Sequence, residues 1–187
     1  MRRIILTLAL FLSFQAIANE LEPIKIGVKY NEATARVEAF KDIQKKVEKE
    51  FYKKYLKDPN KKENLEHIKN ENFVLEEGRT LCPFYIKDTL ATYAIIYDET
   101  PNYTFYYNIL GSLVKFDVFD STQEYPRKIK GYSRFGNLMS VAFEVDEQEQ
   151  FVYNDAGKLV AHWVGNKLLN KNNKNPKFIK LERKFVE

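Results

Sequence analysis

The stretch Tyr153-Asn154-Asp155-Ala156-Gly157-Lys158-Leu159 repeats the spacing of two earlier stretches, residues 107–113 and 132–138, in which tyrosine, glycine and leucine stand at the same positions. Each copy lies between two runs that are rich in β-branched and aromatic residues. Glycine readily adopts the positive φ of a tight reversal, and the flanking tyrosine and leucine suit the strands on either side. The pattern Tyr-x-x-x-Gly-x-Leu therefore predicts three β-hairpins, with turns at Gly111, Gly136 and Gly157.

Strand patterns continue on both sides of these turns. Residues 81–86, 90–97 and 103–109 read as strands, and residues 87–88 and 99–102 read as the turns between them. Later apolar residues alternate with polar ones in three sets: Val114, Phe116 and Val118; Met139, Val141, Phe143 and Val145; and Ile179, Leu181 and Phe185. This period of two is typical of antiparallel strands with one face in water. We expect each apolar set to face the core.

The segment Asn31–Lys57 predicts one long amphipathic helix. Its apolar residues recur at three- and four-residue steps among charged ones: Ala33, Val37, Phe40, Ile43, Val47, Phe51 and Tyr55. No glycine or proline interrupts the pattern, and Asn31 suits the N-cap. Asp58-Pro59 would end this helix, and a shorter one with Leu65 and Ile68 buried would follow.

Residues 1–18 resemble a cleavable secretory signal peptide. Arg2 and Arg3 precede an apolar run at residues 4–14, and Ala16-Ile17-Ala18 supplies a small-x-small cleavage site. The run is shorter than the roughly 20 residues of a membrane-spanning helix. We therefore expect cleavage after Ala18 and a secreted or periplasmic mature chain without a membrane span. An uncleaved N-terminal anchor helix is the alternative.

Composition excludes several classes of protein. Of the 187 residues, 44% are apolar and 14% aromatic, which excludes collagen-like and fully disordered chains. The 30 basic residues barely exceed the 26 acidic ones, and signal cleavage would remove two of the basic ones, so no nucleic-acid partner is expected. The lone cysteine, Cys82, cannot form an intramolecular disulfide.

Together these patterns predict an α+β fold. We expect an N-terminal amphipathic helix packed on a C-terminal antiparallel β-meander or half-closed roll of about six to eight strands. The expected segments are the signal peptide at residues 1–18, the helical segment at 19–78 and a sheet of hairpin repeats at 79–187. The polar residues 166–177 would form an exposed loop before the last strand.

Residues 103–165 resemble the tyrosine-aspartate (YD, or Rhs-type) repeat and related bacterial β-hairpin repeat proteins. The resemblance is strongest in Phe151-Val152-Tyr153-Asn154-Asp155-Ala156-Gly157-Lys158-Leu159-Val160, whereas the first two copies keep tyrosine, glycine and leucine but replace the aspartate. Repeats of this kind build twisted sheets or shells that bind sugars, partner proteins or an enclosed toxin domain. The resemblance thus implies a structural or binding role and assigns no catalytic residue.

Residue types that carry catalysis are few. Cys82 and His162 supply the residue types of a nucleophile–base pair, but a cysteine in an apolar strand is typically inert. Paired acids for glycoside hydrolysis, such as Asp117 and Asp120, are not selected by any motif. The spacing and glycine of a calcium loop are missing from the acidic run Glu144, Asp146, Glu147 and Glu149. We expect no metal, no cofactor and no assignable catalytic residue.

Aromatic side chains give the main functional hypothesis. Exposed tyrosine and tryptophan on a sheet form stacking platforms for sugar rings or for partner side chains. The structural alternative is that they form cross-strand pairs that stabilise the sheet itself. We expect a non-enzymatic binding module for a protein or an envelope glycan, with a binding face made by Tyr107, Tyr132, Tyr153 and Trp163.

Two other functions stay open. A small inhibitor or immunity-type protein of a secreted partner would carry its contacts on one protruding loop, at residues 166–177 or 99–102. An envelope hydrolase with dispersed carboxylates would show a cleft with two facing acids.

Overall fold

The computed structural model describes residues 30–71, 74–75, 78–121, 124–165 and 167–169. Its helical segment comprises α2 (Glu32–Phe40), α3 (Lys49–Tyr52), the 3₁₀ turn η2 (Lys53–Tyr55) and α4 (Lys61–Lys69). The strands that follow in the described residues are β1 (Val74–Leu75), β2 (Arg79–Ile86), β3 (Thr89–Tyr97), β4 (Tyr103–Asn108), β5 (Leu113–Phe119), β6 (Arg127–Ser133), β7 (Leu138–Glu144), β8 (Glu149–Asn154), β9 (Leu159–Val164) and β10 (Lys167–Leu168).

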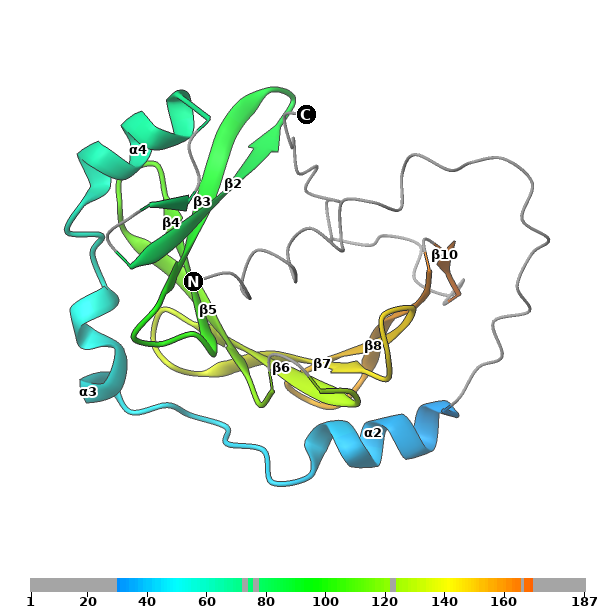
Figure 1. The fold of residues 1–187 in the computed structure, drawn as a ribbon. Coiled ribbons are helices and arrows are strands. Elements are labelled where there is room, and N and C mark those ends of the chain that lie inside the picture. Colours follow the sequence, from blue (N-terminus) through cyan, green and yellow to red (C-terminus); the bar gives the residue numbers. More distant parts are fainter. Residues whose placement is uncertain (1–29, 72–73, 76–77, 122–123, 166, 170–187) are drawn as a thin grey trace, which may run out of the picture.

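The strands form one sheet in which the spatial order is the chain order, β1 to β10, and every neighbouring pair is antiparallel. The sheet is curved, and the helical segment follows the outside of the curve (Figure 1). We call the face toward the helices the covered face and the opposite one the open face. The predicted α+β fold with an antiparallel meander is confirmed.

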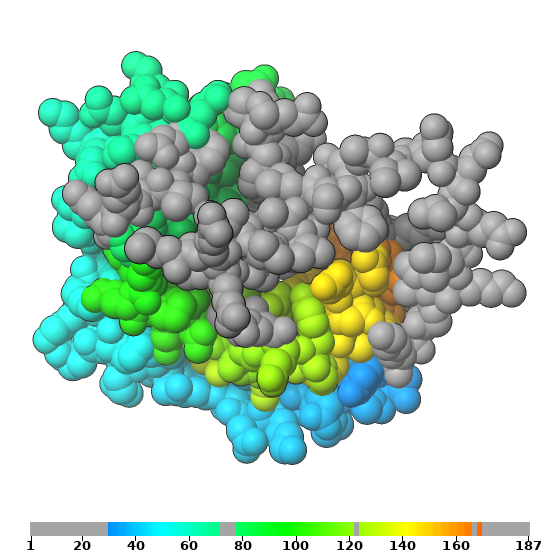
Figure 2. Space-filling view, in the orientation of Figure 1, coloured from blue at the N-terminus to red at the C-terminus, as the bar shows by residue number. Residues whose placement is uncertain are grey.

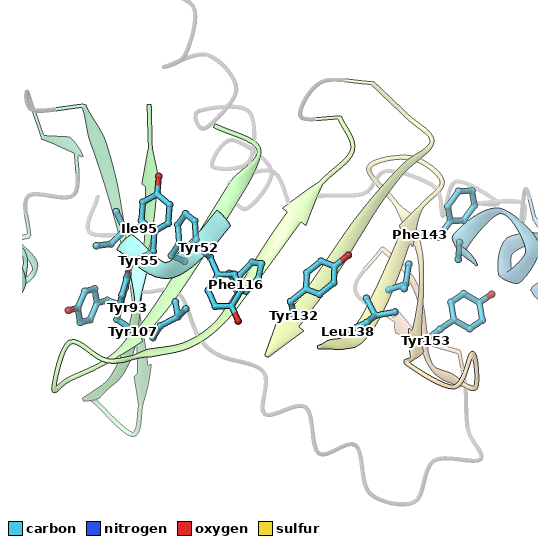
Figure 3. Close-up of a cluster of buried hydrophobic side chains, with 14 of the residues drawn as sticks. Tyr52, Tyr55, Tyr93, Ile95, Tyr107, Phe116, Tyr132, Leu138, Phe143 and Tyr153 are labelled. Atoms are coloured by element: carbon cyan, nitrogen blue, oxygen red, sulfur yellow. The ribbon is translucent and has the colours of Figure 1, made fainter. Parts of the chain in front are cut away.

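The core lies between the covered face and the helical segment. The ring of Tyr55 stacks on Phe105 with centroids 4.0 Å apart, Tyr52 lies 5.0 Å from Phe116, and Phe40 meets Tyr153 edge-on. Figure 3 shows large side chains projecting from successive strands in a row across the sheet. Those at most 1% exposed include Tyr93, Ile95, Phe105, Tyr107, Leu113, Phe116, Tyr132, Val141, Phe151 and Tyr153. Aromatic burial is therefore the main apolar contribution to stability.

Three hairpins, β4–β5, β6–β7 and β8–β9, share one turn geometry. The glycine of each has φ between +72° and +78° and donates its N–H to the carbonyl three residues earlier: Gly111 to Asn108, Gly136 to Ser133 and Gly157 to Asn154. The side-chain oxygen of that earlier residue accepts two backbone N–H groups of the same turn. The predicted reversals at the three glycines are confirmed.

Each of these hairpins also contains a β-bulge one residue beyond its leucine. The register shifts opposite the tyrosine, so one residue of the returning strand is extra: Val114, Met139 and Val160. The expectation that Val114 and Met139 face the core is therefore wrong, and these side chains are 43% and 49% exposed. Phe116 and Val141, beyond the bulges, are buried as predicted.

The single helix expected over residues 31–57 is also wrong. Asn31 does cap α2 by accepting from the N–H of Thr34 at 2.9 Å, but α2 ends at Phe40 and Asp42 has a φ of +55°. Only part of the predicted apolar stripe packs on the sheet: Phe40, Ile43 and Val47 contact the core and Tyr55 is buried in it. Val37 and Phe51 are 67% and 47% exposed, and the buried residues of α2 are Ala35 and Ala39 instead. In the shorter helix α4, Ile68 is buried as predicted and Leu65 is partly buried.

The expected long helix is interrupted because the backbone of this segment forms hydrogen bonds with two hairpin turns. The N–H of Val47 donates to the carbonyl of Gly136 at 2.8 Å, and the N–H of Leu138 donates to the carbonyl of Lys45 at 2.9 Å. An identical pair of bonds joins the first hairpin to residues 56–58, with distances of 2.9 and 3.1 Å. We call each pair a tip bridge; the residues at their centres are Lys46 with Asn137 and Lys57 with Ser112.

Some predicted features lie outside the described residues: the signal peptide, its cleavage site, the final strand at residues 179–185 and most of the loop at 166–177. Residues 167–168 of that loop form β10 instead. None of the described helices is long and apolar enough to cross a membrane. In the space-filling view the helical segment, coloured blue to teal, borders the molecule below and on the left (Figure 2).

Candidate functional site

Three of the four residues assigned to a binding face lie in the core. Tyr107, Tyr132 and Tyr153 are 0%, 1% and 0% exposed on the covered face, so the helical segment shields them from any partner. Two of them hold that segment in place. The hydroxyl of Tyr132 donates to the carbonyl of Gln44 at 2.9 Å, and that of Tyr153 donates to the carbonyl of Glu32 at 3.1 Å. Burial raises the pKa of Tyr153 to about 12.

The bulge in β9 decides which way His162 and Trp163 face. His162 lies opposite Phe151 on the covered face, where the two rings stack 3.9 Å apart and His162 Nε2 lies 3.0 Å from Glu149 Oε1. Trp163 lies opposite Gln150 and therefore belongs to the open face. Trp163, the fourth assigned residue, is half-buried and lies on the face that no described helix covers.

The possible nucleophile pair does not form. Cys82 is on β2 and His162 on β9, seven positions apart in the strand order. Cys82 lies opposite Ala94 on the open face, whereas His162 is on the covered face. These positions exclude direct proton transfer between the two side chains.

The acidic residues considered for metal binding or hydrolysis have other partners. Asp146 Oδ1 accepts the backbone N–H groups of residues 148 and 149 within a turn. Asp117 pairs with Lys115, and Asp120 accepts the N–H of Lys128 at 2.6 Å. Within the described parts of the chain, no three His, Cys, Asp or Glu side chains are grouped so that they could hold a metal ion.

A polar group at the middle of the open face, the central cluster, consists of Tyr106, Lys115, Asp117 and Ser140. Lys115 Nζ contacts both carboxylate oxygens of Asp117, at 3.0 and 3.1 Å, and lies 4.0 Å from the centre of the Tyr106 ring. Gly131 separates Asp117 from Ser140. A Cβ on Gly131 would lie 2.6 Å from Ser140 Oγ and 3.2 Å from Asp117 Oδ1, so only glycine leaves room for these two side chains to approach each other across β6.

A second group, the Arg127 row, crosses four strands of the open face at one level. Arg127, Glu144, Gln150 and Trp163 are successive cross-strand partners. Glu144 accepts from Arg127 Nε at 2.5 Å and from Gln150 Nε2 at 2.9 Å. The Arg127 guanidinium also lies 4.7 Å from the centre of the Tyr125 ring, a cation–π distance.

Both groups combine a paired cation and anion with an aromatic ring. Donor N–H groups, carboxylate acceptors and flat rings are thus grouped on this face, a combination typical of sites for hydroxyl-rich or peptide ligands. The charges of each pair cancel, so the face has little attraction for a polyanion. Of the two loops considered for an inhibitor, residues 99–102 are anchored to the helical segment, because Glu99 accepts from Lys54 and from the Tyr55 hydroxyl at 2.9 Å.

Sequence reasoning missed the central cluster and the Arg127 row. A signal was present, because Lys115 and Asp117 stand on the polar side of a predicted strand. What the sequence lacked was the register that sets Lys115 opposite Tyr106 and Arg127 opposite Glu144. Comparison with protein-family models, with curated proteins and with solved structures gives no match for this chain. The function must therefore be inferred from the chemistry of the site.

Proposed function

We propose that the protein is a non-enzymatic binding module of the bacterial envelope that binds a protein or a glycan through the open face of its sheet. One observation carries this proposal: the helical segment packs on one face of the sheet, and polar and aromatic clusters lie on the other. The helical segment occupies the covered face, whereas the open face carries the central cluster and the Arg127 row, to which no described helix is bound.

The aromatic residues of this face are Tyr106 and Trp163, in place of the three buried tyrosines. Each is half-buried and lies beside polar side chains that are already paired, so little side-chain entropy is lost on binding. An aromatic ring next to fixed donors and acceptors is a common arrangement for sugar and peptide recognition. The resemblance of residues 103–165 to YD-type repeats supports the same role, because such repeats build binding sheets.

The location in the envelope is part of the proposal and depends on residues 1–18. Their basic start, apolar run and Ala16-Ile17-Ala18 site favour export, with the mature chain secreted or periplasmic. Expression of the full chain followed by N-terminal sequencing of the periplasmic fraction tests this point. A mature N-terminus at Asn19 supports export, and an intact Met1 in the cytoplasm contradicts it.

Binding is tested with the exported chain and two defined preparations. Purified peptidoglycan sacculi test the glycan partner by co-sedimentation, and immobilised protein tests capture from envelope extract, with the captured protein identified and its affinity then measured. We expect Tyr106→Ala and Trp163→Ala to reduce binding by about tenfold each. Phe135→Ala is the matched control, because Phe135 is 66% exposed in a hairpin turn.

Three outcomes distinguish the open-face binding module from its alternatives. Loss of binding in the two open-face variants but not in Phe135→Ala supports the proposal. Equal binding by all three variants removes the open face as the site. Hydrolysis of the sacculi by the wild-type chain, abolished in Asp117→Asn, would establish the hydrolase alternative instead.

A further inference from the structure

Two of the three hairpins use the backbone of their turns to bind the helical segment, and the third does not. In each tip bridge the glycine carbonyl accepts one N–H and the following leucine donates its own N–H. The equivalent groups of the third hairpin are the carbonyl of Gly157 and the N–H of Leu159. Among the described residues, no backbone group outside the strand ladder bonds to either, and Lys158 has no bridge partner.

The reason is that the chain is helical where a third bridge would fall. The centres of the two tip bridges, Lys46 and Lys57, are eleven residues apart. A third segment at the same spacing would be centred on residue 35, which is inside α2. Instead of a backbone strand, the side chain of Arg36 lies over Gly157, with Nε and Nη2 each 3.2 Å from the position of a glycine Cβ.

A groove of about 500 Å³ opens at this place between α2 and the third hairpin turn. Apolar side chains of one side of α2 line it, and Val37 among them is 67% exposed. The groove also contains two cations and no acidic side chain. Its lining residues are Ala33, Arg36, Val37, Phe40, Lys45, Ala156 and Gly157.

The two cations differ in their contacts. Lys45 Nζ donates to the carbonyl of Asp155 at 2.6 Å and lies 5.2 Å from the centre of the Phe40 ring. Arg36, by contrast, forms no hydrogen bond or ion pair with any described residue. An exposed guanidinium beside an apolar groove is complementary to a carboxylate.

We propose that the third hairpin turn is a docking site for an extended peptide segment of a partner protein that carries an acidic side chain. The peptide forms a third tip bridge: one of its N–H groups donates to the carbonyl of Gly157, and one of its carbonyls accepts from the N–H of Leu159. Its carboxylate pairs with Arg36, and its apolar side chains contact Val37 and Phe40. This is strand addition in the form that the chain itself uses twice.

This site is separate from the open face, so the two proposals stand or fall independently. It lies at the border of the covered face, between α2 and the β8–β9 turn. The partner's chemistry follows from both parts of the site. Backbone pairing requires an extended peptide, and the two cations select against a basic one.

The test uses the full chain, labelled with ¹⁵N, and three acetylated, amidated pentapeptides. The probe is Thr-Val-Glu-Val-Thr. Its charge control replaces the glutamate with lysine. Its backbone control carries N-methyl groups on both valines, which removes the two N–H donors on one edge of the extended peptide and keeps the charge. Binding is followed by the amide chemical shifts of Lys158 and Leu159 and by the hydrogen-exchange rate of the Leu159 N–H.

We expect the acidic probe to shift both amides and to slow exchange of the Leu159 N–H. The lysine and N-methylated peptides should each bind at least about tenfold more weakly, because each lacks one part of the recognition. Arg36→Gln should weaken the acidic probe by about tenfold. Lys62→Gln is the matched control, because it removes one exposed cation from α4 and should leave affinity unchanged.

Four results would overturn the proposal. The first is an unshifted Leu159 amide at saturating probe, and the second is equal affinity for the acidic and basic peptides. The third is undiminished binding of the N-methylated peptide, which would reduce the site to a charge contact. The fourth is a Leu159 N–H already protected from exchange without peptide, which would mean that another part of this chain fills the position. Equal melting temperatures of Arg36→Gln and wild type exclude unfolding as a cause.

Discussion

The hydroxyl of Tyr93, on β3, donates a 2.6 Å hydrogen bond to the buried carboxylate of Asp58, in the helical segment. Asp58 also accepts from the side chain of Asn64 and from the N–H of Asn60. Asn64 in turn accepts from Arg79 Nε at 2.9 Å, so the network joins α4 to β2 and β3. A carboxylate this deeply buried is stable because each of its oxygens is hydrogen-bonded.

Tyr93→Phe should lower the free energy of unfolding by about 1–2 kcal/mol, because the Asp58 carboxylate loses one buried donor. Asp58→Ala should cost more, about 3 kcal/mol, since it leaves Tyr93 and Asn64 without their acceptor. Urea denaturation followed by circular dichroism measures both. Tyr85→Phe is the control, because Tyr85 is a half-buried tyrosine that is not part of this network. A loss in Tyr93→Phe no larger than in Tyr85→Phe would contradict the assigned role.

Stability should fall in alkaline solution because of buried tyrosines. Burial raises the pKa of Tyr97 and of Tyr153 to about 12, against about 10 in an unfolded chain. Above pH 10 the unfolded chain loses phenolic protons that the folded chain keeps. The free energy of unfolding is therefore fully retained below pH 10 and decreases as the pH rises toward 12, by up to about 1.4 kcal/mol per pH unit for each tyrosine.

Urea titrations at pH 8, 10 and 11 measure this decrease. Tyr153→Phe should reduce the slope above pH 10, because phenylalanine does not titrate. A free energy of unfolding that is constant up to pH 11 would refute the assignment.

Gly136→Ala and Gly157→Ala form a matched pair. Both glycines have a positive φ, +78° and +75°, so an alanine at either position costs about 1–2 kcal/mol of backbone strain. At Gly136 the new Cβ would also lie 2.3 Å from the carbonyl oxygen of Val47, the residue whose N–H donates in a tip bridge. At Gly157 it meets the flexible Arg36 side chain instead. Gly136→Ala should therefore destabilise the chain by about 2 kcal/mol more, measured by urea denaturation. Equal losses would argue against the tip bridge.

Gly131→Ala should destabilise the chain by about 1–3 kcal/mol, although alanine normally suits a strand better than glycine. The cause is the 2.6 Å approach of the new Cβ to Ser140 Oγ on the open face. Adding Ser140→Gly should recover part of the loss, since it removes the clashing hydroxyl. A double-mutant cycle of thermal unfolding measures the coupling, and strictly additive effects would count against this geometry.

Sequence patterns predicted the strands well because the alternation and the turn residues agree at each hairpin. They failed for residues 41–48, because the hydrogen bonds between that segment and the Gly136 turn join parts of the chain that are distant in sequence. Helical periodicity correctly placed Phe40, Ile43 and Val47 against the core but wrongly placed Val37 and Phe51 there. Tertiary pairing decided that the backbone of residues 41–48 would not be helical.

The candidate site was less predictable for a related reason. One extra residue in β9, at Val160, is enough to move His162 to the covered face and Trp163 to the open face. Tyr107, Tyr132 and Tyr153 could be placed beside turns from sequence, but the side on which the helical segment packs could not. Lys115 with Tyr106 and Arg127 with Glu144 become neighbours only through the register of four strands.

The strand order gives this chain an unusual sequence of events during its synthesis. Each strand pairs with the one just made, so the hairpins can close one after another as they leave the ribosome. The helical segment is made before them, yet the hydroxyl of Tyr153 that holds the Glu32 carbonyl stands 121 positions later. Until β8 has been translated, α2 lacks that contact. The bond that holds the start of α2 therefore forms only after almost the whole sheet has been translated.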